Sequence, residues 1–249
     1  MPEVPAFPQF PEDASALVVG AGGGIGAAVA AQLDRSPRFA TVLRTGRDPA
    51  RLDPGAIALD LEDDTSIETC AGAVAERTDV LHLVVICAGL LHDEAAGIAP
   101  EKRLKDLSRT ALHRSFDVNA VGPLLLARAL APRLPRREHA VWATLSARVG
   151  SIGDNGLGGW YAYRGAKAAQ NMFTRNLAIE LGRRHRGLAC VGLHPGTVAT
   201  DLSAPFRSAD AEGVMPPARA AAQLLAVIDG LEARDSGRFL AWDGSEIPW

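Results

Sequence analysis

The sequence predicts a single α/β domain built on a doubly wound, parallel β-sheet with helices on both faces. Two observations predict this class. Short, almost wholly apolar runs alternate along the chain with segments of helical periodicity, as expected when strands are covered on both faces. The first apolar run ends in a glycine-rich turn that opens a helix, which is typical of a nucleotide-binding crossover. With 249 residues, 47% of them hydrophobic, the chain is large enough for one substantial core.

The apolar runs are the expected strands, and we place them at 16–19, 41–43, 56–59, 81–86, 140–145, 188–193 and 238–240. Helices are expected between them at 25–33, 66–76, 114–134, 160–181 and 218–228. Parallel neighbours require crossover connections, which are right-handed in nearly all sheets. The alternation therefore predicts a Rossmann-type fold over residues 13–249, with no linker or repeat dividing it.

Residues 1–12 differ from the rest because they form a proline-rich N-terminal arm. Proline recurs at every third position, from Pro2 to Pro11, which disfavours a helix and favours an extended chain. Phe7 and Phe10 lie between the prolines. The composition favours a loose tail. The alternative is an arm that lays its phenylalanines on the domain or on a neighbouring subunit.

The charge pattern argues against two classes of partner. The net charge is −3 and no basic stripe is present, so we expect no nucleic-acid partner. Residues 14–33 carry no charge and are numerous enough to suggest a membrane helix or a signal peptide. That stretch contains several glycines, however, and follows Glu12 and Asp13 rather than a basic region. We therefore expect neither export nor membrane insertion.

Cysteine and histidine usage indicates the compartment and argues against a metal site. The 3 cysteines, Cys70, Cys87 and Cys190, are widely spaced and form neither a disulfide framework nor a CxxC pair. A reducing cytoplasm fits this pattern best. The 6 histidines are scattered and none forms an HxxxH pair, so no metal site is expected.

The first crossover carries the nucleotide-binding signal. Gly20, Gly24 and Gly26, with Ile25 between the last two, form a GxxxGxG turn between the first expected strand and the first expected helix. Glycines let the chain turn sharply and let the backbone approach a pyrophosphate, and the helix N-terminus offers N–H groups. Position in the fold, rather than the pattern alone, makes this a cofactor loop.

The residues just after the second expected strand indicate which cofactor the chain prefers. A carboxylate there selects a free 2′-hydroxyl of the adenosine ribose, whereas an arginine accommodates a 2′-phosphate. No acid occupies residues 44–47, while Arg44 and Arg47 are present. The sequence therefore favours NADP(H) over NAD(H), with Arg47 as the assigned residue, and Asp48 keeps NAD(H) open.

Tyr163 and Lys167 supply the catalytic signal. They are four residues apart on an expected helix, and this spacing puts them on one face. A tyrosine of ordinary pKa is a poor acid–base catalyst near neutral pH, and a nearby ammonium favours its phenolate. The pair follows the fifth expected strand, downstream of the cofactor loop, which favours a catalytic role.

In their order and number these motifs resemble the classical short-chain dehydrogenase/reductase family over nearly the whole chain. The resemblance implies cofactor contacts from Gly20, Gly24, Ile25, Gly26, Asp60, Leu61, Cys87, Ala88, Gly89, Tyr163, Lys167, Pro195, Gly196, Val198 and Thr200. It also implies that Asn119 holds a water next to Lys167. The chain departs from the family at Ile86-Cys87, where two asparagines are usual, and at Val19, where threonine is usual.

A narrower resemblance points to the C-factor and sniffer-like carbonyl reductases. It rests on residues 146–152, 158–163 and 241–249. Within this pattern the catalytic serine has two candidates. The usual register, three residues before a glycine, falls on Ala147. Ser146 at the end of the fifth strand is favoured, and Ser151 is the alternative.

The resemblance implies an NADP(H)-dependent oxidoreductase that moves hydride between the nicotinamide and a ketone, an aldehyde or a secondary alcohol. Tyr163 is the expected acid, Ser146 the expected carbonyl-orienting group, and Lys167 and Asn119 their support. Two alternatives remain, an NAD-linked alcohol dehydrogenase and a nucleotide-binding signalling protein with weak turnover. The family also pairs its long helices, so we expect a homodimer or homotetramer with a small carbonyl or alcohol as substrate.

Overall fold

The computed structural model describes residues 5–249 and contains one central sheet with its strands in the order β3-β2-β1-β4-β5-β6-β9. Every neighbouring pair is parallel. The strands are β1 (Ala14–Val19), β2 (Phe39–Gly46), β3 (Ile57–Ala58), β4 (Leu83–Ile86), β5 (Ala140–Leu145), β6 (Leu188–His194) and β9 (Phe239–Ala241). A separate pair joins β7 (Thr197–Val198) to β8 (Val214–Met215).

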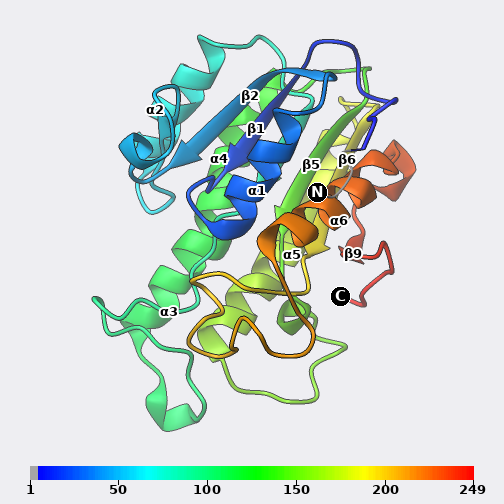
Figure 1. Cartoon of the computed structure of the whole chain (residues 1–249). Coiled ribbons are helices and arrows are strands. Elements are labelled where there is room, and N and C mark those ends of the chain that lie inside the picture. The colour runs from blue at the N-terminus through cyan, green and yellow to red at the C-terminus, as the bar shows by residue number, and fades with distance from the viewer. Residues whose placement is uncertain (1–4) are drawn as a thin grey trace.

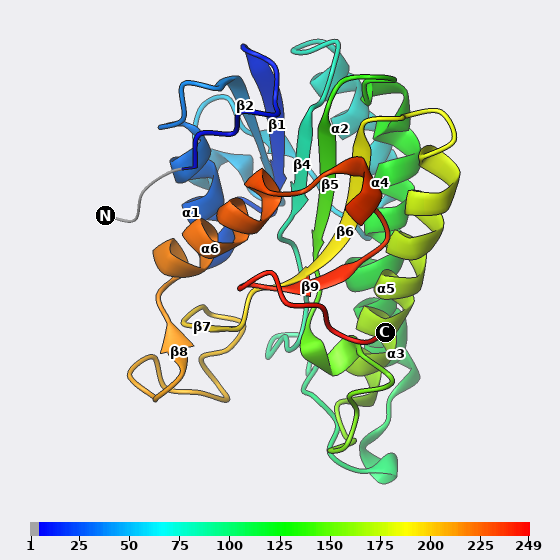
Figure 2. The same cartoon turned by 90° about the vertical axis from the view of Figure 1, so that its right-hand side faces the viewer.

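Helices cover both faces of the sheet (Figures 1 and 2). They are α1 (Gly24–Leu33), α2 (Asp64–Ala75), α3 (Arg109–Phe116), α4 (Gly122–Leu130), α5 (Tyr161–Leu181) and α6 (Pro217–Asp229). Helices α1 and α6 bury one face together with Val18, Val85 and Val141. Helices α2 and α4 bury the other face, with Leu17 and Trp142 among their partners, and α5 lies beside α4. The predicted Rossmann-type fold is confirmed.

The strand order reverses between β1 and β4, and this fixes where a ligand can lie. Chain connections leave to opposite sides of these two neighbours, so a crevice forms at their carboxyl ends. The glycine-rich turn follows β1, and residues 87–90 follow β4. The fold therefore brings the two expected cofactor-binding segments, the glycine-rich turn and the segment with Cys87, Ala88 and Gly89, to one edge of the sheet.

The expected helix 114–134 is present as one continuous helical run over residues 109–133, but it is not α-helical throughout. The run consists of α3, then a π-helical segment over Asp117–Val121, then α4. The N–H of Gly122 donates to the carbonyl of Asp117, five residues back, which widens the turn. Pro123, at the start of α4, has no N–H to donate to the preceding turn, so the α-helical hydrogen bond is missing at this point. The helix also begins earlier than expected, because the Ser108 side chain caps it.

The N-terminal arm packs on the domain, and its interpretation as a loose tail is wrong for residues 5–12. Phe7 and Phe10 are fully buried and belong to the same core as α1 and α6. Their rings meet edge-on at 5.7 Å, and Phe7 meets Phe39 at the start of β2 in the same way at 5.2 Å. The arm therefore closes the end of the core opposite the cofactor loop. Pro2 lies outside the described residues.

Candidate active site

Two glycines of the loop after β1 are required by the backbone geometry. Gly20 has φ of +80°, and a Cβ there would lie 2.8 Å from the backbone nitrogen of Ala88. A Cβ on Gly26 would lie 2.2 Å from the carbonyl oxygen of Gly20. A side chain at Gly20 would push the loop away from the residues after β4, and a side chain at Gly26 would push the helix away from the loop itself. The two carboxyl-end loops consequently lie in direct contact.

The start of α1 has the features of a pyrophosphate site. Its N-cap, Gly23, carries no capping side chain, and the first turn contains no acidic residue. The first N–H groups of the helix therefore have no side-chain partner, and Gly22 to Gly24 are exposed. A Cβ at Gly24 would lie 2.8 Å from Cγ2 of Thr200, so the segment after Pro195-Gly196 crosses close to the helix start. These residues fit a dinucleotide phosphate.

The two arginines after β2 differ in their surroundings. Arg44 is paired with Asp34 and, at 3.3 Å, with Asp53, which fixes its guanidinium to the protein. Arg47 is exposed and has no ion pair within residues 5–249. Asp48, the residue that kept NAD(H) open, pairs with Arg51 at 2.9 Å. Of the two arginines, only Arg47 can meet a 2′-phosphate without giving up an ion pair.

Asp60 and Leu61, the residues expected to contact the adenine, lie after β3 and against the start of α4. Asp60 is half-buried, and its Oδ1 accepts the N–H of Glu62 at 3.0 Å. Leu61 is buried, and a Cβ at Gly122 would lie 2.3 Å from the Leu61 carbonyl oxygen. The close packing of these two segments fixes the Asp60-Leu61 turn next to the crevice.

Tyr163 and Lys167 lie in the first two turns of α5, and both are buried. The lysine Nζ is 5.7 Å from the centre of the tyrosine ring. It donates to the Leu145 carbonyl oxygen at 2.9 Å and to Oε1 of Gln170 at 3.1 Å. Burial lowers the pKa of Lys167 to about 7, and burial also raises the pKa of Tyr163 above its ordinary value. Tyr163 is therefore protonated at neutral pH.

Asn119 lies in the π-helical segment and joins it to the loop after β4. Its Oδ1 accepts the Leu90 N–H at 3.0 Å, and its Nδ2 donates to the Leu90 carbonyl at 2.8 Å. A Cβ at Gly89 would lie 3.3 Å from Oδ1 of Asn119 and 3.8 Å from Nζ of Lys167. The structure thus gathers Asn119, Lys167 and the Ala88-Gly89 turn around one point.

Neither candidate serine contacts Tyr163 through a hydrogen bond. Ser146 is buried, and its hydroxyl donates to Oδ1 of Asn171 on α5 at 2.6 Å. The Ser151 hydroxyl donates to the carbonyl of Pro248. Both hydroxyls therefore make hydrogen bonds within the protein. Ala147, at the position where the family usually has its catalytic serine, has no hydroxyl.

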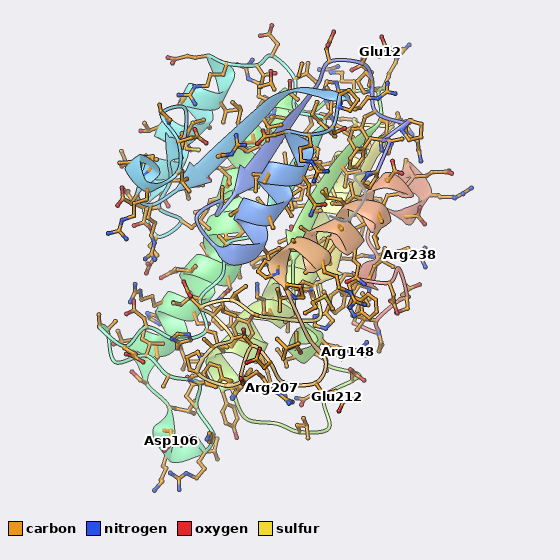
Figure 3. All side chains as sticks on the ribbon, in the orientation of Figure 1. Glu12, Asp106, Arg148, Arg207, Glu212 and Arg238 are labelled. Atoms are coloured by element: carbon orange, nitrogen blue, oxygen red, sulfur yellow. The ribbon has the colours of Figure 1, made fainter. Side chains whose placement is uncertain are left out.

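Three irregular segments close over the Tyr163 side of the crevice. In Figure 3 the labelled Asp106, Arg148 and Arg207 mark these segments at one end of the molecule, opposite Glu12. Aromatic contacts join them, with ring centres 5.7 Å apart for His92 and Phe206 and 5.3 Å apart for Trp160 and Phe206. Trp160 in turn meets Tyr163 edge-on at 6.4 Å. Aromatic contacts therefore join the segments to one another and to Tyr163.

Sequence reasoning missed three polar residues at this site. Gln170 and Asn171 follow Lys167 by three and four positions, so helical spacing could have placed them beside it. Glu101 is buried in an irregular segment, where no periodicity could have found it.

Two other expectations concern metals and thiols. Residues 5–249 contain no cluster of three or more metal-ligating side chains. Burial raises the pKa of Cys87, at the end of β4, to about 12, so this thiol is not a reactive thiolate. Within the same residues no helix is both long and apolar enough to cross a membrane.

Comparison with known proteins agrees with this geometry. A family model described as short chain dehydrogenase matches residues 14–211. The 1-hydroxy-2-glutathionyl-2-methyl-3-butene dehydrogenase of Rhodococcus sp. (strain AD45) is 35% identical over 239 residues, 94% of this chain and 98% of that enzyme. The C-signal of Myxococcus xanthus is 38% identical over 146 residues, 59% of this chain and 83% of that protein. An NADPH-bound carbonyl reductase from chicken fatty liver superposes with a TM-score of 0.82 at 27% identity, covering 96% of this chain and 95% of its own.

Proposed function

Because this chain belongs to the short-chain dehydrogenase family and its predicted resemblance to C-factor and carbonyl reductases is confirmed, we propose that it is an NADP(H)-dependent carbonyl reductase. The observation that carries the proposal is the buried Tyr163–Lys167 pair, which lies with Asn119 at the edge of the sheet that also holds the glycine-rich loop. Such a pair, a protonated phenol beside an ammonium, can deliver a proton to a forming alkoxide.

The chain's own residues would hold the cofactor across the carboxyl edge of the sheet. The α1 start takes the pyrophosphate, Asp60 and Leu61 border the adenine, and Cys87, Ala88 and Gly89 border the nicotinamide half. Pro195, Gly196, Val198 and Thr200 close the nicotinamide end from the β6 side. When bound, reduced nicotinamide supplies the hydride for the carbonyl carbon.

Tyr163 is the proposed general acid. Its raised pKa keeps the phenol protonated at neutral pH, so it arrives at the carbonyl oxygen with the proton that reduction requires. The ammonium of Lys167 stabilises the phenolate left behind, and its side chain reaches the cofactor ribose from the same helix. Asn119 holds the backbone beside Lys167 where a water can return the proton. The raised pKa favours reduction over alcohol oxidation, which would begin from a phenolate.

Ser146 is the proposed carbonyl-orienting residue. It directly follows Leu145, the last residue of β5, whose carbonyl accepts from Lys167, so Ser146 lies on the segment that contacts the lysine. The Ser146 hydroxyl donates its single proton to Oδ1 of Asn171, so a substrate carbonyl has to replace Asn171 as the acceptor. Ser151 is the weaker candidate, because its hydroxyl is fixed on Pro248 near the C-terminus.

The cofactor experiment is a fluorescence titration with NADPH and NADH, followed by absorbance measurements with a panel of aldehydes and ketones. We expect tighter binding of NADPH, with carbonyl-dependent loss of the reduced-nicotinamide absorbance. Arg47→Ala should weaken NADPH binding by about 10- to 100-fold, because one charge-assisted contact with phosphate is lost, and should leave NADH binding unchanged. Arg35→Ala, an exposed arginine just beyond the C-terminal end of α1, is the matched control. Equal binding of the two nucleotides would contradict the NADP(H) assignment and favour an NAD-linked dehydrogenase.

One observation supports a second candidate function. Both serine hydroxyls are engaged in hydrogen bonds to the protein and Ala147 has none, as would suit a nucleotide-binding signalling protein with weak turnover. Tight NADPH binding without turnover over the whole carbonyl panel would favour it.

In either function we propose a homo-oligomer that pairs α4 and α5, where Met172 and Ile179 are 59% and 51% exposed.

A further inference from the structure

A small, partly open cavity lies against Tyr163. Its volume is about 10 Å³, and Leu91, Ile98, Glu101, Ser115 and Tyr163 are among its lining residues. A space of this size holds one water-sized group. Its walls are apolar except for the side chains of Glu101, Ser115 and Tyr163, so those polar groups decide what can occupy it.

Glu101 is fixed at the start of α5 by two contacts. Its Oε2 accepts the N–H of Ala162 at 3.2 Å, and its own carbonyl accepts the N–H of Trp160. Trp160 is the N-cap of α5 but has φ of +50° and offers no capping side chain, so Glu101 caps the helix from another segment. This role uses only one of its two carboxylate oxygens.

The second oxygen has no partner. Glu101 is only 4% exposed, and its Oε1 is buried without a hydrogen bond from any of residues 5–249. A buried carboxylate oxygen without a donor is unfavourable, and such a group is normally satisfied by a ligand or by water. The cavity beside Tyr163 is where a donor can reach it.

Ser115 supplies the complementary half of the cavity. Its side chain is buried, and its Oγ accepts from Nδ2 of Asn119 at 3.3 Å. The hydroxyl proton has no acceptor among the described residues, so it is free to donate into the cavity. Besides the phenol of Tyr163, the cavity therefore presents one charged acceptor and one donor.

We propose that this cavity binds a second hydroxyl of the substrate, so that the enzyme selects hydroxy ketones or hydroxy aldehydes over simple carbonyl compounds. The substrate hydroxyl donates to Oε1 of Glu101 and accepts from Ser115. An ammonium group would satisfy Glu101 but cannot accept the serine proton, and a carboxylate would be repelled by Glu101. The inference rests on the proposed carbonyl reductase function and adds its substrate class.

The test compares 2-butanone with 1-hydroxy-2-butanone and 4-hydroxy-2-butanone as substrates with saturating NADPH. We expect kcat/KM to be at least about tenfold higher for one of the hydroxy ketones, which is the discrimination given by one hydrogen bond to a charged group. In Glu101→Gln the amide oxygen keeps the Ala162 contact and the NH₂ group faces the cavity, so the preference should fall to about one. The preference is the ratio of kcat/KM for a hydroxy ketone to kcat/KM for 2-butanone, so a general loss of activity in the variant cancels. Glu94→Gln, an exposed acid on the same segment, should keep the preference.

Dissociation constants of the same three ketones for the enzyme–NADPH complex, from ligand-observed NMR, test the inference without turnover. Tighter binding of a hydroxy ketone that Glu101→Gln or Ser115→Ala abolishes would support it. Equal binding of all three ketones, or a preference that survives in Glu101→Gln, would overturn it and leave water as the occupant. Turnover without preference would contradict only this inference, whereas binding preference without turnover of any carbonyl would contradict the proposed function.

Discussion

Lys167 is a cation held by neutral groups. Its ammonium has the Leu145 carbonyl and the Gln170 amide oxygen as acceptors, the Tyr163 ring lies beside it, and no carboxylate pairs with it within residues 5–249. Burial without a counter-charge lowers its pKa to about 7, which puts its charge change in the working range of the enzyme. Under the proposed mechanism, the protonation state of this lysine would set the pH range in which the site acts.

The pH dependence of reduction follows from that lysine. As the pH rises through about 7, Lys167 loses the charge that stabilises the Tyr163 phenolate, so kcat/KM should fall about tenfold per unit above that point. Tyr163 does not change its protonation state in this pH range, because burial raises its pKa. The measurement is kcat/KM for carbonyl reduction between pH 6 and pH 9. A flat profile up to pH 9 would show that the charge on Lys167 is not required.

The two serines make opposite predictions. Ser146→Ala should lower kcat/KM by about 10- to 100-fold, because one hydrogen bond to the developing charge is lost. Ser151→Ala removes the bonds to the Pro248 carbonyl and the Asp154 N–H, neither of which involves Tyr163 or Lys167, and should leave kcat/KM close to that of the parent enzyme. Steady-state kinetics of both variants with one carbonyl substrate decides the assignment. The reverse pattern would transfer the role to Ser151, and full activity in both would remove serine from the mechanism.

At the scale of elements, the N-terminal arm contributes stability rather than chemistry. Phe10 is 1% exposed and packs its ring on His139 at 4.5 Å and on Phe39 at 5.3 Å. Phe10→Ala should cost about 3–5 kcal/mol through the cavity that it leaves, which corresponds to a fall in Tm of about 6–20 °C. Differential scanning calorimetry measures the fall, and Leu157→Ala, at a side chain 93% exposed, is the control. An unchanged Tm in Phe10→Ala would mean that the arm does not pack in solution.

Periodicity predicted the strands and most helices because apolar content decides them. Each of the seven expected strands overlaps one strand of the sheet. The π-helical segment between α3 and α4 was missed because their apolar pattern is continuous. The deciding features are the absent N–H of Pro123 and the close approach of Gly122 to Leu61, and the second of these is a tertiary contact. The arm was misjudged for a similar reason, since its partner Phe39 is distant in sequence.

The site was predictable where a motif fixes both the residue and its element. Tyr163 and Lys167 lie together as expected, because helical spacing puts them on one face. Asn119 was expected beside Lys167 from the family resemblance alone, and both side chains lie against Gly89. The serine was not decided by sequence, since the direction of a hydroxyl at a strand end changes with a single residue of register. Glu101 could not be found, because its burial depends on how an irregular segment folds over α5.

At the scale of the whole molecule, the two halves of the sheet carry different groups of the expected site residues. The β1-β2-β3 half carries the glycine-rich loop and Arg47, and the β4-β5-β6 half leads into Asn119, Ser146 and α5 (Figure 1). The strand order reverses where these halves meet, so a cofactor lying across the carboxyl edge would touch both. In the proposed function, the irregular segments at that edge would add the surface that meets the substrate.

The measurement that tests this account most directly compares the parent enzyme with Tyr163→Phe. Both are titrated with NADPH by fluorescence and then assayed with the best carbonyl substrate from the panel. The account predicts unchanged NADPH affinity and a loss of about 10²- to 10⁴-fold in kcat, because the proton donor is removed while the cofactor site remains. Turnover by Tyr163→Phe at the parent rate would contradict the assignment of Tyr163 as the acid and with it the proposed mechanism.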